Sequence, residues 1–350
     1  MITDNSAIVG RVSCLAFGVL FALSTCAAQQ PPISNTEKFE FGVIGDQQYT
    51  PETEAQFPFI MAELDRTNLV FVVHVGDFRT GAPDGGAISC ADATFAKRKA
   101  TFDASAHPFI FTPGDNEWTD CSCCSKPLFD PLERLEKLRE LFFPEGESLG
   151  KTRISLTRQS TYAAYKKFVE NAYWVHNEIL FATIHVVGSN NNLGRTPDAD
   201  AEYRERNAAD LVWLRNVFGI AKQRNLRAAV ILTQANPKFE DVWSRNLRNR
   251  VGLPPNPARE STSGYAELLE VLRVESVAFS KPVLFIHGDT HYFQVNQPMV
   301  DAEGRMVENF TRLEVFGSPN SHWVRVLVDP EDAEPFSFRT QIVKENLLPH

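Results

Sequence analysis

Four aspartates in this chain each follow a glycine at the end of an apolar run, and their carboxylates are groups that bind metal ions. The dipeptide Gly-Asp occurs four times and nowhere else, at Asp46, Asp77, Asp115 and Asp289. An apolar run rich in β-branched residues predicts a buried strand, and the glycine permits a sharp turn after it. Each aspartate is therefore expected at the carboxyl end of a strand, where open α/β sheets bind ligands. Four carboxylates gathered there would repel one another unless cations lay between them, so we predict one or two metal ions.

The elements that must position these aspartates alternate between strands and helices, which predicts an α/β fold. Leucines recur at helical spacing between Pro131 and Leu141. The whole pattern predicts helices over 51–65, 131–141, 161–170, 202–223 and 263–278, and strands before each Gly-Asp and over 178–187, 227–233, 310–316 and 322–328, the last two as a hairpin. Eight or more strands exceed what one half of a doubly wound sheet needs, so we expect two stacked sheets.

The order of the strand-end motifs resembles that of the calcineurin-like metallophosphoesterases. That family has Asp-x-His, Gly-Asp, Gly-Asn-His-Asp/Glu, a single His and Gly-His-x-His, in this order. The corresponding segments here begin at Asp46, Gly76, Gly114, Gln234 and Gly288, and the resemblance covers about residues 39–293. It implies a four-layer α/β/β/α sandwich of two stacked mixed sheets flanked by helices, in a single domain over 38–345. It also implies a binuclear metal centre and hydrolysis of a phosphate ester.

The metal ligands that the resemblance implies depart from the family pattern in one direction, from nitrogen to oxygen. One site would comprise Asp46, Gln48, Asp77 and His291, and the other Asp77, Asp115, Gln234 and Asp289, with Asp77 bridging both ions. Gln48 and Gln234 stand where the family has histidine, and an offset that uses Asn236 is the alternative for the second. Oxygen-rich sites favour Mg²⁺, Mn²⁺ or Ca²⁺ over zinc, so we predict two hard divalent ions.

The implied reaction is metal-assisted hydrolysis, in which two ions bind phosphoryl oxygens and activate a hydroxide. Asn116 stands where the family has its catalytic histidine, and a carboxamide cannot protonate a leaving alkoxide. Glu117, Asp120 and His287 are nearby alternatives for the general acid. Arg79, two residues after Asp77, is expected to hold a phosphate oxygen, or else to be a solvated loop charge.

Two more residues are candidates for binding a small phosphorylated substrate. Trp118 would either pack beside the site or stack on a substrate ring. Asn190 follows a strand that ends near Gly188 and would line the pocket, unless this segment is a plain turn.

The N-terminus predicts an exported protein. An uncharged apolar stretch follows Arg11 and is too short for a membrane span, so residues 1–28 are predicted to be a signal peptide and 29–37 a linker. A weak lipoprotein-like motif would place a lipid anchor at Cys26, and a buried helix is the alternative for the whole segment. We therefore expect a periplasmic or secreted protein, attached to a membrane only through this segment. The net charge of −9 and the absence of a basic run argue against a nucleic-acid partner.

Four cysteines remain after removal of the predicted signal peptide. In an exported chain they suggest disulfides, and Cys90 is expected to pair with one of the clustered Cys121, Cys123 and Cys124, with Cys121 as the candidate. Such a bond would tie the loop after the second strand to the loop after the third. A zinc knot is the alternative, but the adjacent Cys123 and Cys124 lack the usual spacing.

Two functional hypotheses follow from these patterns. The first is an exported metal-dependent phosphoesterase. The second is a degenerate relative that binds a metal ion or a phosphorylated ligand without turnover, in which Gln48, Asn116 and Gln234 are simple hydrogen-bonding groups.

Overall fold

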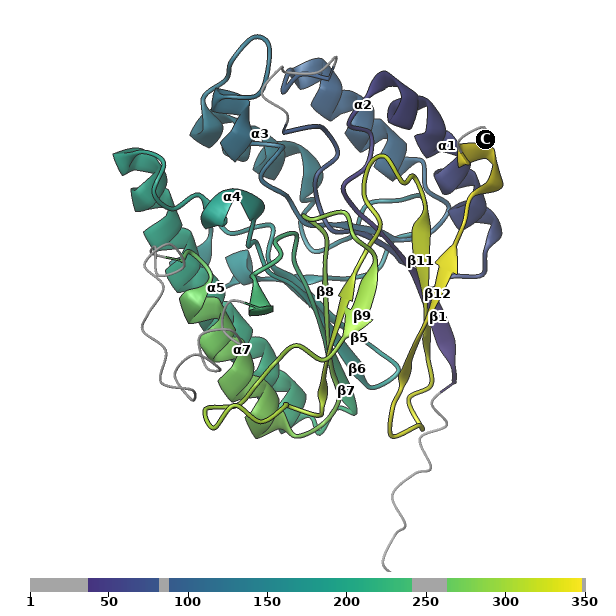
Figure 1. The fold of residues 1–350 in the computed structure, drawn as a ribbon, viewed down its shortest axis with the longest axis vertical. Coiled ribbons are helices and arrows are strands. Elements are labelled where there is room, and N and C mark those ends of the chain that lie inside the picture. The colour runs from purple at the N-terminus through teal and green to yellow at the C-terminus, as the bar shows by residue number, and fades with distance from the viewer. Residues whose placement is uncertain (1–36, 82–87, 241–262, 348–350) are drawn as a thin grey trace, which may run out of the picture. The chain divides into compact units, whose positions relative to one another are not determined.

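The computed structural model describes residues 37–81, 88–240 and 263–347, which are the coloured parts of Figure 1. The predicted signal peptide, nearly all of the predicted linker and Cys26 lie outside the described residues. In the described ranges, no helix has the length and apolar character needed to cross a membrane.

The first sheet has five strands in the order β12-β11-β1-β2-β3. Three neighbouring strands run parallel, and the other two strands are each antiparallel to their neighbours. The strands are β1 (Phe39–Ile44), β2 (Val72–His74) and β3 (Phe109–Phe111), which run parallel, and β11 (Trp323–Val328) and β12 (Phe336–Gln341), which form an antiparallel pair beside β1.

The second sheet has seven strands in the order β4-β5-β6-β7-β8-β10-β9. Its parallel centre consists of β6 (Ile179–Thr183), β7 (Ala228–Leu232), β8 (Val283–His287) and β10 (Phe310–Glu314). The antiparallel edges are β4 (Thr157–Arg158) with β5 (Ala172–His176) on one side and β9 (Gln294–Asn296) on the other. Both sheets therefore combine parallel and antiparallel pairs of strands. The candidate site residues follow the parallel strands in the sequence.

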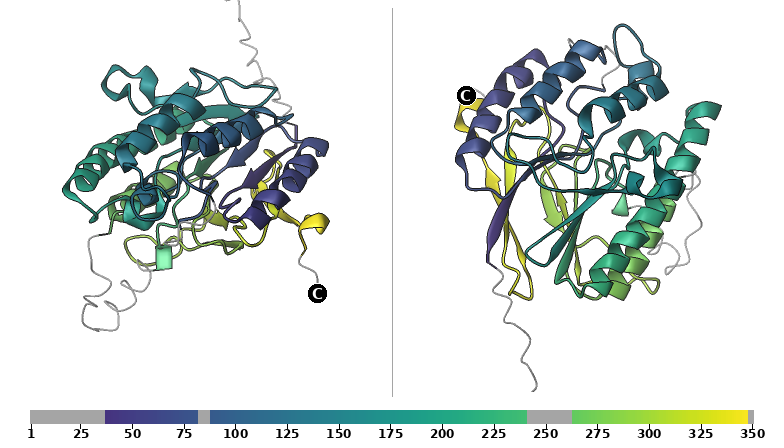
Figure 2. Two further views of the ribbon diagram at one scale, coloured as in Figure 1. Left: turned by 90° about the horizontal axis from the view of Figure 1, so that it is seen from above. Right: turned by 180° about the vertical axis from the view of Figure 1, so that it is seen from behind.

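Helices cover the outer face of each sheet, so the layers run α/β/β/α. Figure 1 and the two views of Figure 2 show the purple-to-blue helices and the green helices on opposite sides of the strands. The first group is α1 (Pro51–Arg66), α2 (Asp92–Asp103) and α3 (Pro131–Phe142), and the second is α5 (Pro197–Gln223) and α7 (Ala266–Phe279). This arrangement confirms the predicted fold class.

Alternating side chains of the central strands fill the layers between sheets and helices. On β2, Val73 packs between the two sheets while Val72 packs against α1 and its neighbours. On β8, Leu284 packs between the sheets while Phe285 faces α5 and α7. Strands that are buried on both faces are apolar at nearly every position, which explains the continuous apolar runs before each Gly-Asp.

Three of the helices, α1, α3 and α5, begin at capping side chains. Thr50 caps α1 in a capping box with Thr53, and Pro51 is the first helical residue. Asp130 and Thr196 cap α3 and α5, each followed by a proline. The loop between β1 and α1 is therefore only the segment 45–50, which limits how far its side chains can move.

Two sequence predictions about elements are wrong. The predicted helix over 161–170 is replaced by two short 3₁₀ turns, Gln159–Thr161 and Ala163–Tyr165. Tertiary hydrogen bonds take this segment out of the helical path, because Arg158 donates to the Val169 carbonyl at 2.8 Å and Arg139 binds Glu170. The predicted hairpin of 310–316 with 322–328 is also absent, because these strands are β10 and β11 in different sheets.

Candidate metal centre

The loops after the parallel strands meet at one edge and are joined by backbone hydrogen bonds. The Asp46 amide donates to the Gly76 carbonyl at 2.9 Å, and the Gly288 amide donates to the Gln234 carbonyl at 3.0 Å. The Asp289 amide donates to both carboxylate oxygens of Asp46, at 3.0 and 3.1 Å, which joins β1 of one sheet to β8 of the other. The four Gly-Asp aspartates therefore belong to one cluster, as the sequence predicts.

Two glycines leave the space that the carboxylates occupy. A side chain on Gly288 would place its Cβ 1.9 Å from Asp46 Oδ2. A Cβ on Gly188 would lie 2.7 Å from oxygens of both Asp115 and Asp289. Gly188 follows β6, at the strand end where the sequence predicts either a pocket lining with Asn190 or a plain turn. These glycines are needed because any larger residue would push the carboxylates apart.

Left-handed backbone is concentrated at the site. Five of the seven predicted metal ligands have positive φ, namely Asp46 (54°), Gln48 (64°), Asp77 (60°), Asp289 (81°) and His291 (64°). A second run of such residues, 189–192, has φ between 51° and 68° and follows Gly188 directly. Each costs roughly 1–2 kcal/mol in an L-residue, although less for Asn and Asp. Strain of this kind persists where the surrounding structure imposes it, and it is typical of functional sites.

Burial and mutual repulsion raise the pKa of the clustered carboxyl groups. The pKa of Asp46 and of Asp77 lies well above the usual range, first because of burial and then because of the nearby Asp289 and Asp115 carboxylates respectively. Burial and the neighbouring Asp120 raise the pKa of Asp115 in the same way. Burial also raises the pKa of Asp289 to about 6. A bound cation would reverse this penalty, so the cluster has the electrostatics of a metal site.

His291 is oriented as a metal ligand would be. Its Nδ1 lies 2.7 Å from the Ser318 carbonyl oxygen, which can only accept, so Nδ1 carries the proton. Its Nε2 then presents a lone pair, 3.5 Å from Asp46 Oδ1. Burial lowers the pKa of His291, which favours the neutral form that metals require. A carbonyl that fixes the tautomer in this way is the usual partner of a metal-binding histidine.

The donor set suits a cation, but not one held by the carboxylates and histidine alone. Asp115 Oδ1 is buried and has no hydrogen-bond partner. Among the residues that the structure describes, no group of three His, Cys, Asp or Glu side chains has the geometry to hold an ion. Any ion bound here must therefore use a further type of donor or draw the side chains together.

Tyr49 is a residue of the site that the sequence reasoning missed. Its hydroxyl oxygen lies 3.0 Å from Asp77 Oδ2 and 3.2 Å from His291 Nε2, and it accepts a hydrogen bond from Asn116 Nδ2 at 2.9 Å. Burial and the Asp77 carboxylate raise the pKa of Tyr49 well above its usual value. Its position three residues after Asp46 in the loop before α1 was the available signal.

The amide side chains of the predicted ligand Gln234 and of Asn116, at the predicted catalytic position, are engaged with other protein groups. Gln234 donates through Nε2 to Asp77 Oδ2 at 3.1 Å and accepts from the Gly188 amide at 2.6 Å. Asn116 donates through Nδ2 to the Arg79 carbonyl at 2.9 Å as well as to Tyr49. The alternative residue Asn236 contacts Asp289 Oδ2 only through its backbone amide, at 2.9 Å. These amides organise the carboxylates from within the protein.

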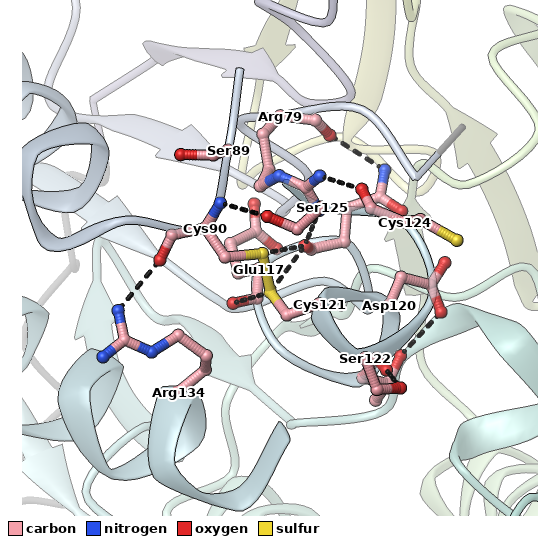
Figure 3. Close-up of a disulfide and its surroundings, with 12 residues drawn as sticks. Arg79, Ser89, Cys90, Glu117, Asp120, Cys121, Ser122, Cys124, Ser125 and Arg134 are labelled. Carbon is pink, nitrogen blue, oxygen red and sulfur yellow. Dashed lines mark hydrogen bonds between the residues drawn. A yellow bond between two sulfur atoms is a disulfide. The ribbon is translucent and has the colours of Figure 1, made fainter. Parts of the chain in front are cut away.

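Arg79 and Glu117 support the loops rather than face a substrate. Arg79 is fully buried and donates to the carbonyls of Ile88, Asn116 and Cys124, at 3.2, 2.6 and 2.5 Å, so it is neither a solvated charge nor free to hold a phosphate (Figure 3). Glu117 is also fully buried and accepts from the backbone amides of Phe78 and Gly114. Both residues link the loop after β2 to the loop after β3, which corrects their assignment as catalytic candidates.

Trp118 and Asn190 are likewise structural. Trp118 is fully buried and packs on the Arg206 guanidinium and the His185 ring, so the packing alternative applies and no face is open to a substrate. Asn190 accepts from the Gly264 amide at 2.9 Å and donates to the Leu193 carbonyl at 3.0 Å, which holds the left-handed turn against the segment before α7.

The candidates for a general acid differ in their surroundings. His287 is fully buried, and burial lowers its pKa to about 3. Asp120 lies nearer the surface, where it accepts from Arg195 at 2.6 Å and from Ser189 Oγ at 3.2 Å. Arg195, whose side chain is 29% exposed, is thus a cation at the rim of the site that sequence reasoning did not identify.

The predicted disulfide between Cys90 and Cys121 is present. It joins the segment before α2 to the 3₁₀ turn Thr119–Ser122, as Figure 3 shows, and Arg134 donates to the Cys90 carbonyl at 2.8 Å. The adjacent Cys123 and Cys124 form a second disulfide. With all four cysteines paired, the zinc-knot alternative is excluded, and the loop that carries Asp115 and Asn116 is covalently braced.

Comparison with known proteins identifies no close relative. No protein-family model matches the sequence, and no curated protein matches it. Among solved structures, a 5′-nucleotidase from Candida albicans aligns with 10% identity and a TM-score of 0.44, over 86% of this chain and 50% of that one. Vacuolar protein sorting 29 from Cryptosporidium parvum aligns with 10% identity and a TM-score of 0.29, over 87% of this chain and 97% of that one. This chain therefore spans half the length of the nucleotidase, and these values identify no function.

Proposed function

We propose that this protein is an exported, metal-dependent hydrolase that acts on a small phosphate ester. This proposal rests on one observation, the convergence of Asp46, Asp77, Asp115 and Asp289 from four strand ends, where the pKa of each carboxyl group is raised. A group of acidic side chains that destabilises itself is retained where it binds a cation. The motif order along the chain supports phosphoester chemistry.

The residues that would hold the ion are those that present oxygen or a neutral nitrogen to the cluster. Asp46, Asp77 and His291 lie on one side, and Asp115 and Asp289 approach Gly188 on the other. When bound, a divalent ion would supply a Lewis acid that polarises phosphoryl oxygens and activates water. The oxygen-rich donors support Mg²⁺, Mn²⁺ or Ca²⁺.

Other side chains would prepare the site for an anionic substrate. Arg195 donates to Asp120 at the rim and can exchange this partner for a phosphate oxygen with the same charge-assisted geometry. Asp120 is then left beside the leaving group and is the general-acid candidate that the surroundings favour over Glu117 and His287. Asn116 orients Tyr49 and does not move a proton.

The rival function is binding of an ion or a phosphorylated ligand without turnover. It is favoured by the contacts of Gln234, whose amide donates to Asp77 and accepts from the Gly188 backbone. Hydrolysis of 4-nitrophenyl phosphate and bis-(4-nitrophenyl) phosphate with added Mn²⁺ or Mg²⁺ tests the two functions. Turnover that is lost in Asp77→Asn and kept in Asp332→Asn, an exposed control, supports the hydrolase. Tight ion binding without turnover of either ester would refute it.

A further inference from the structure

The Tyr49 hydroxyl lies among side chains from four different strand-end loops. Its oxygen is 3.4 Å from Asp46 Oδ1 after β1, 3.0 Å from Asp77 Oδ2 after β2, and 3.2 Å from His291 Nε2 after β8. Asn116 after β3 donates to it at 2.9 Å. The hydroxyl is therefore a member of the cluster and not a neighbour of one residue.

Four separations among these donor atoms match those of ligands around a single ion. Tyr49 lies 3.0–3.4 Å from the other three donors, and Asp46 Oδ1 lies 3.5 Å from His291 Nε2. Neighbouring ligands at 2.0–2.2 Å from a tetrahedral ion are about 3.3–3.6 Å apart, and those at about 2.1 Å from an octahedral ion are about 3.0 Å apart. Each measured separation is close to one of these values.

The Tyr49 hydroxyl cannot serve all of its neighbours at once, although Asp46 Oδ1 also accepts from the Asp289 amide and Asp77 Oδ2 from Gln234 Nε2. A tyrosine hydroxyl has one proton, whereas Asp46 Oδ1, Asp77 Oδ2 and His291 Nε2 all present lone pairs to it. One cation would attract all three acceptors and the phenol oxygen together.

Gln48 does not share these contacts. Its Oε1 is buried without a hydrogen-bond partner, and none of the hydrogen bonds of Asp46, Asp77 and His291 described above involves it. We propose that Tyr49, through its phenol oxygen, is a metal ligand in the position that the family pattern gives to residue 48. This inference rests on the proposed function only in requiring a divalent ion at the cluster.

The test is Mn²⁺ binding to the full chain by isothermal titration calorimetry, in the wild type, Tyr49→Phe, Gln48→Ala and the exposed control Tyr162→Phe. Tyr49→Phe keeps the ring and removes only the oxygen, so its effect is not one of lost packing. We expect its Mn²⁺ dissociation constant to rise about 10–100-fold, because even residues that only support a ligand have effects of this size. Gln48→Ala and Tyr162→Phe are expected to stay within about threefold of the wild type.

A spectroscopic readout separates ligation from a structural role. Mn²⁺ is expected to perturb the ultraviolet absorption of one tyrosine in the wild type, and this difference spectrum should vanish in Tyr49→Phe. Unchanged or tighter binding by Tyr49→Phe, an equal loss in Gln48→Ala, or no Mn²⁺ binding by the wild type would overturn the inference. These outcomes do not depend on turnover. Normal ion binding without hydrolysis would therefore refute the proposed function and not this inference.

Discussion

Replacing Asp289 by asparagine should stabilise the metal-free protein. Burial raises the pKa of this carboxyl from 3.8 to about 6, which means that the folded state penalises its charged form. The difference corresponds to about 3 kcal/mol at full ionisation, at roughly 1.4 kcal/mol per pKa unit. The substituted carboxamide would keep an acceptor for the Asn236 amide but lose a charge-assisted bond. We therefore expect a net gain of about 1–3 kcal/mol at pH 8.

The sign of the effect depends on pH. A raised folded-state pKa makes the wild type lose stability as pH rises from about 4 through 6, because the folded state then loses protons that the unfolded state has already released. The advantage of Asp289→Asn should therefore be full above pH 7 and absent near pH 4. Urea unfolding in a chelator, at several pH values, measures it. The exposed control Asp332→Asn should stay within about 0.5 kcal/mol of the wild type.

Addition of metal should reverse the order of stability. At an ion concentration about 100 times the dissociation constant, binding stabilises the wild type by about 2.7 kcal/mol, and Asp289→Asn should gain less. If Asp289→Asn were less stable than the wild type in chelator at pH 8, burial would not be penalising the charged form of the site carboxylates. The reasoning that they form a metal centre would then lose its basis.

Three further substitutions test how the site is built. Gly188→Ala should weaken Mn²⁺ binding at least about tenfold, because its Cβ would lie 2.7 Å from the Asp115 and Asp289 oxygens. The matched control is Gly219→Ala, at a helical glycine with open space around it, and equal Mn²⁺ affinities of the two variants would contradict the packing. Arg79→Lys should lower the free energy of unfolding by about 2–4 kcal/mol, since one ammonium cannot reach three buried carbonyls. Urea unfolding measures this change, and a loss below about 1 kcal/mol would argue against the role of Arg79 in holding the loops together. Arg195→Gln should raise KM for a phosphate ester severalfold with little change in kcat; a selective loss of kcat would instead place Arg195 at the reacting atoms.

Local sequence patterns were sufficient for the layers of the fold and for the carboxylates. Each apolar run before Gly-Asp is a strand buried on both faces, and the sequence pattern located α1, α3 and α5 to within a few residues. Parallel strands bring their carboxyl ends to one edge, so Asp46, Asp77, Asp115 and Asp289 could be grouped without coordinates. The sequence limited the expected partner of Cys90 to Cys121, Cys123 or Cys124, with Cys121 as the candidate, and the structure has Cys121.

Long-range contacts decided what the sequence could not show. Residues 161–170 have a helical composition but do not form a helix, because residues at the end of this segment hydrogen-bond with Arg158 and Arg139. The positions of these two arginines depend on other elements. In the same way, Arg79 is two residues from a site aspartate yet directs its charge to carbonyls far along the chain. Sequence proximity to a motif does not determine side-chain direction, because a buried cation goes where partners compensate its desolvation.

The sequence by itself determined which loops form the site and that their chemistry is rich in oxygen. Only the tertiary structure decided which atoms within those loops face one another. Tyr49 and Gln48 are neighbours in one short loop, but left-handed backbone at Gln48 and the cap of α1 at Thr50 hold the tyrosine hydroxyl toward Asp77 and His291. The pairing of donors across two sheets depends on angles and distances set by packing, which no one-dimensional spacing records.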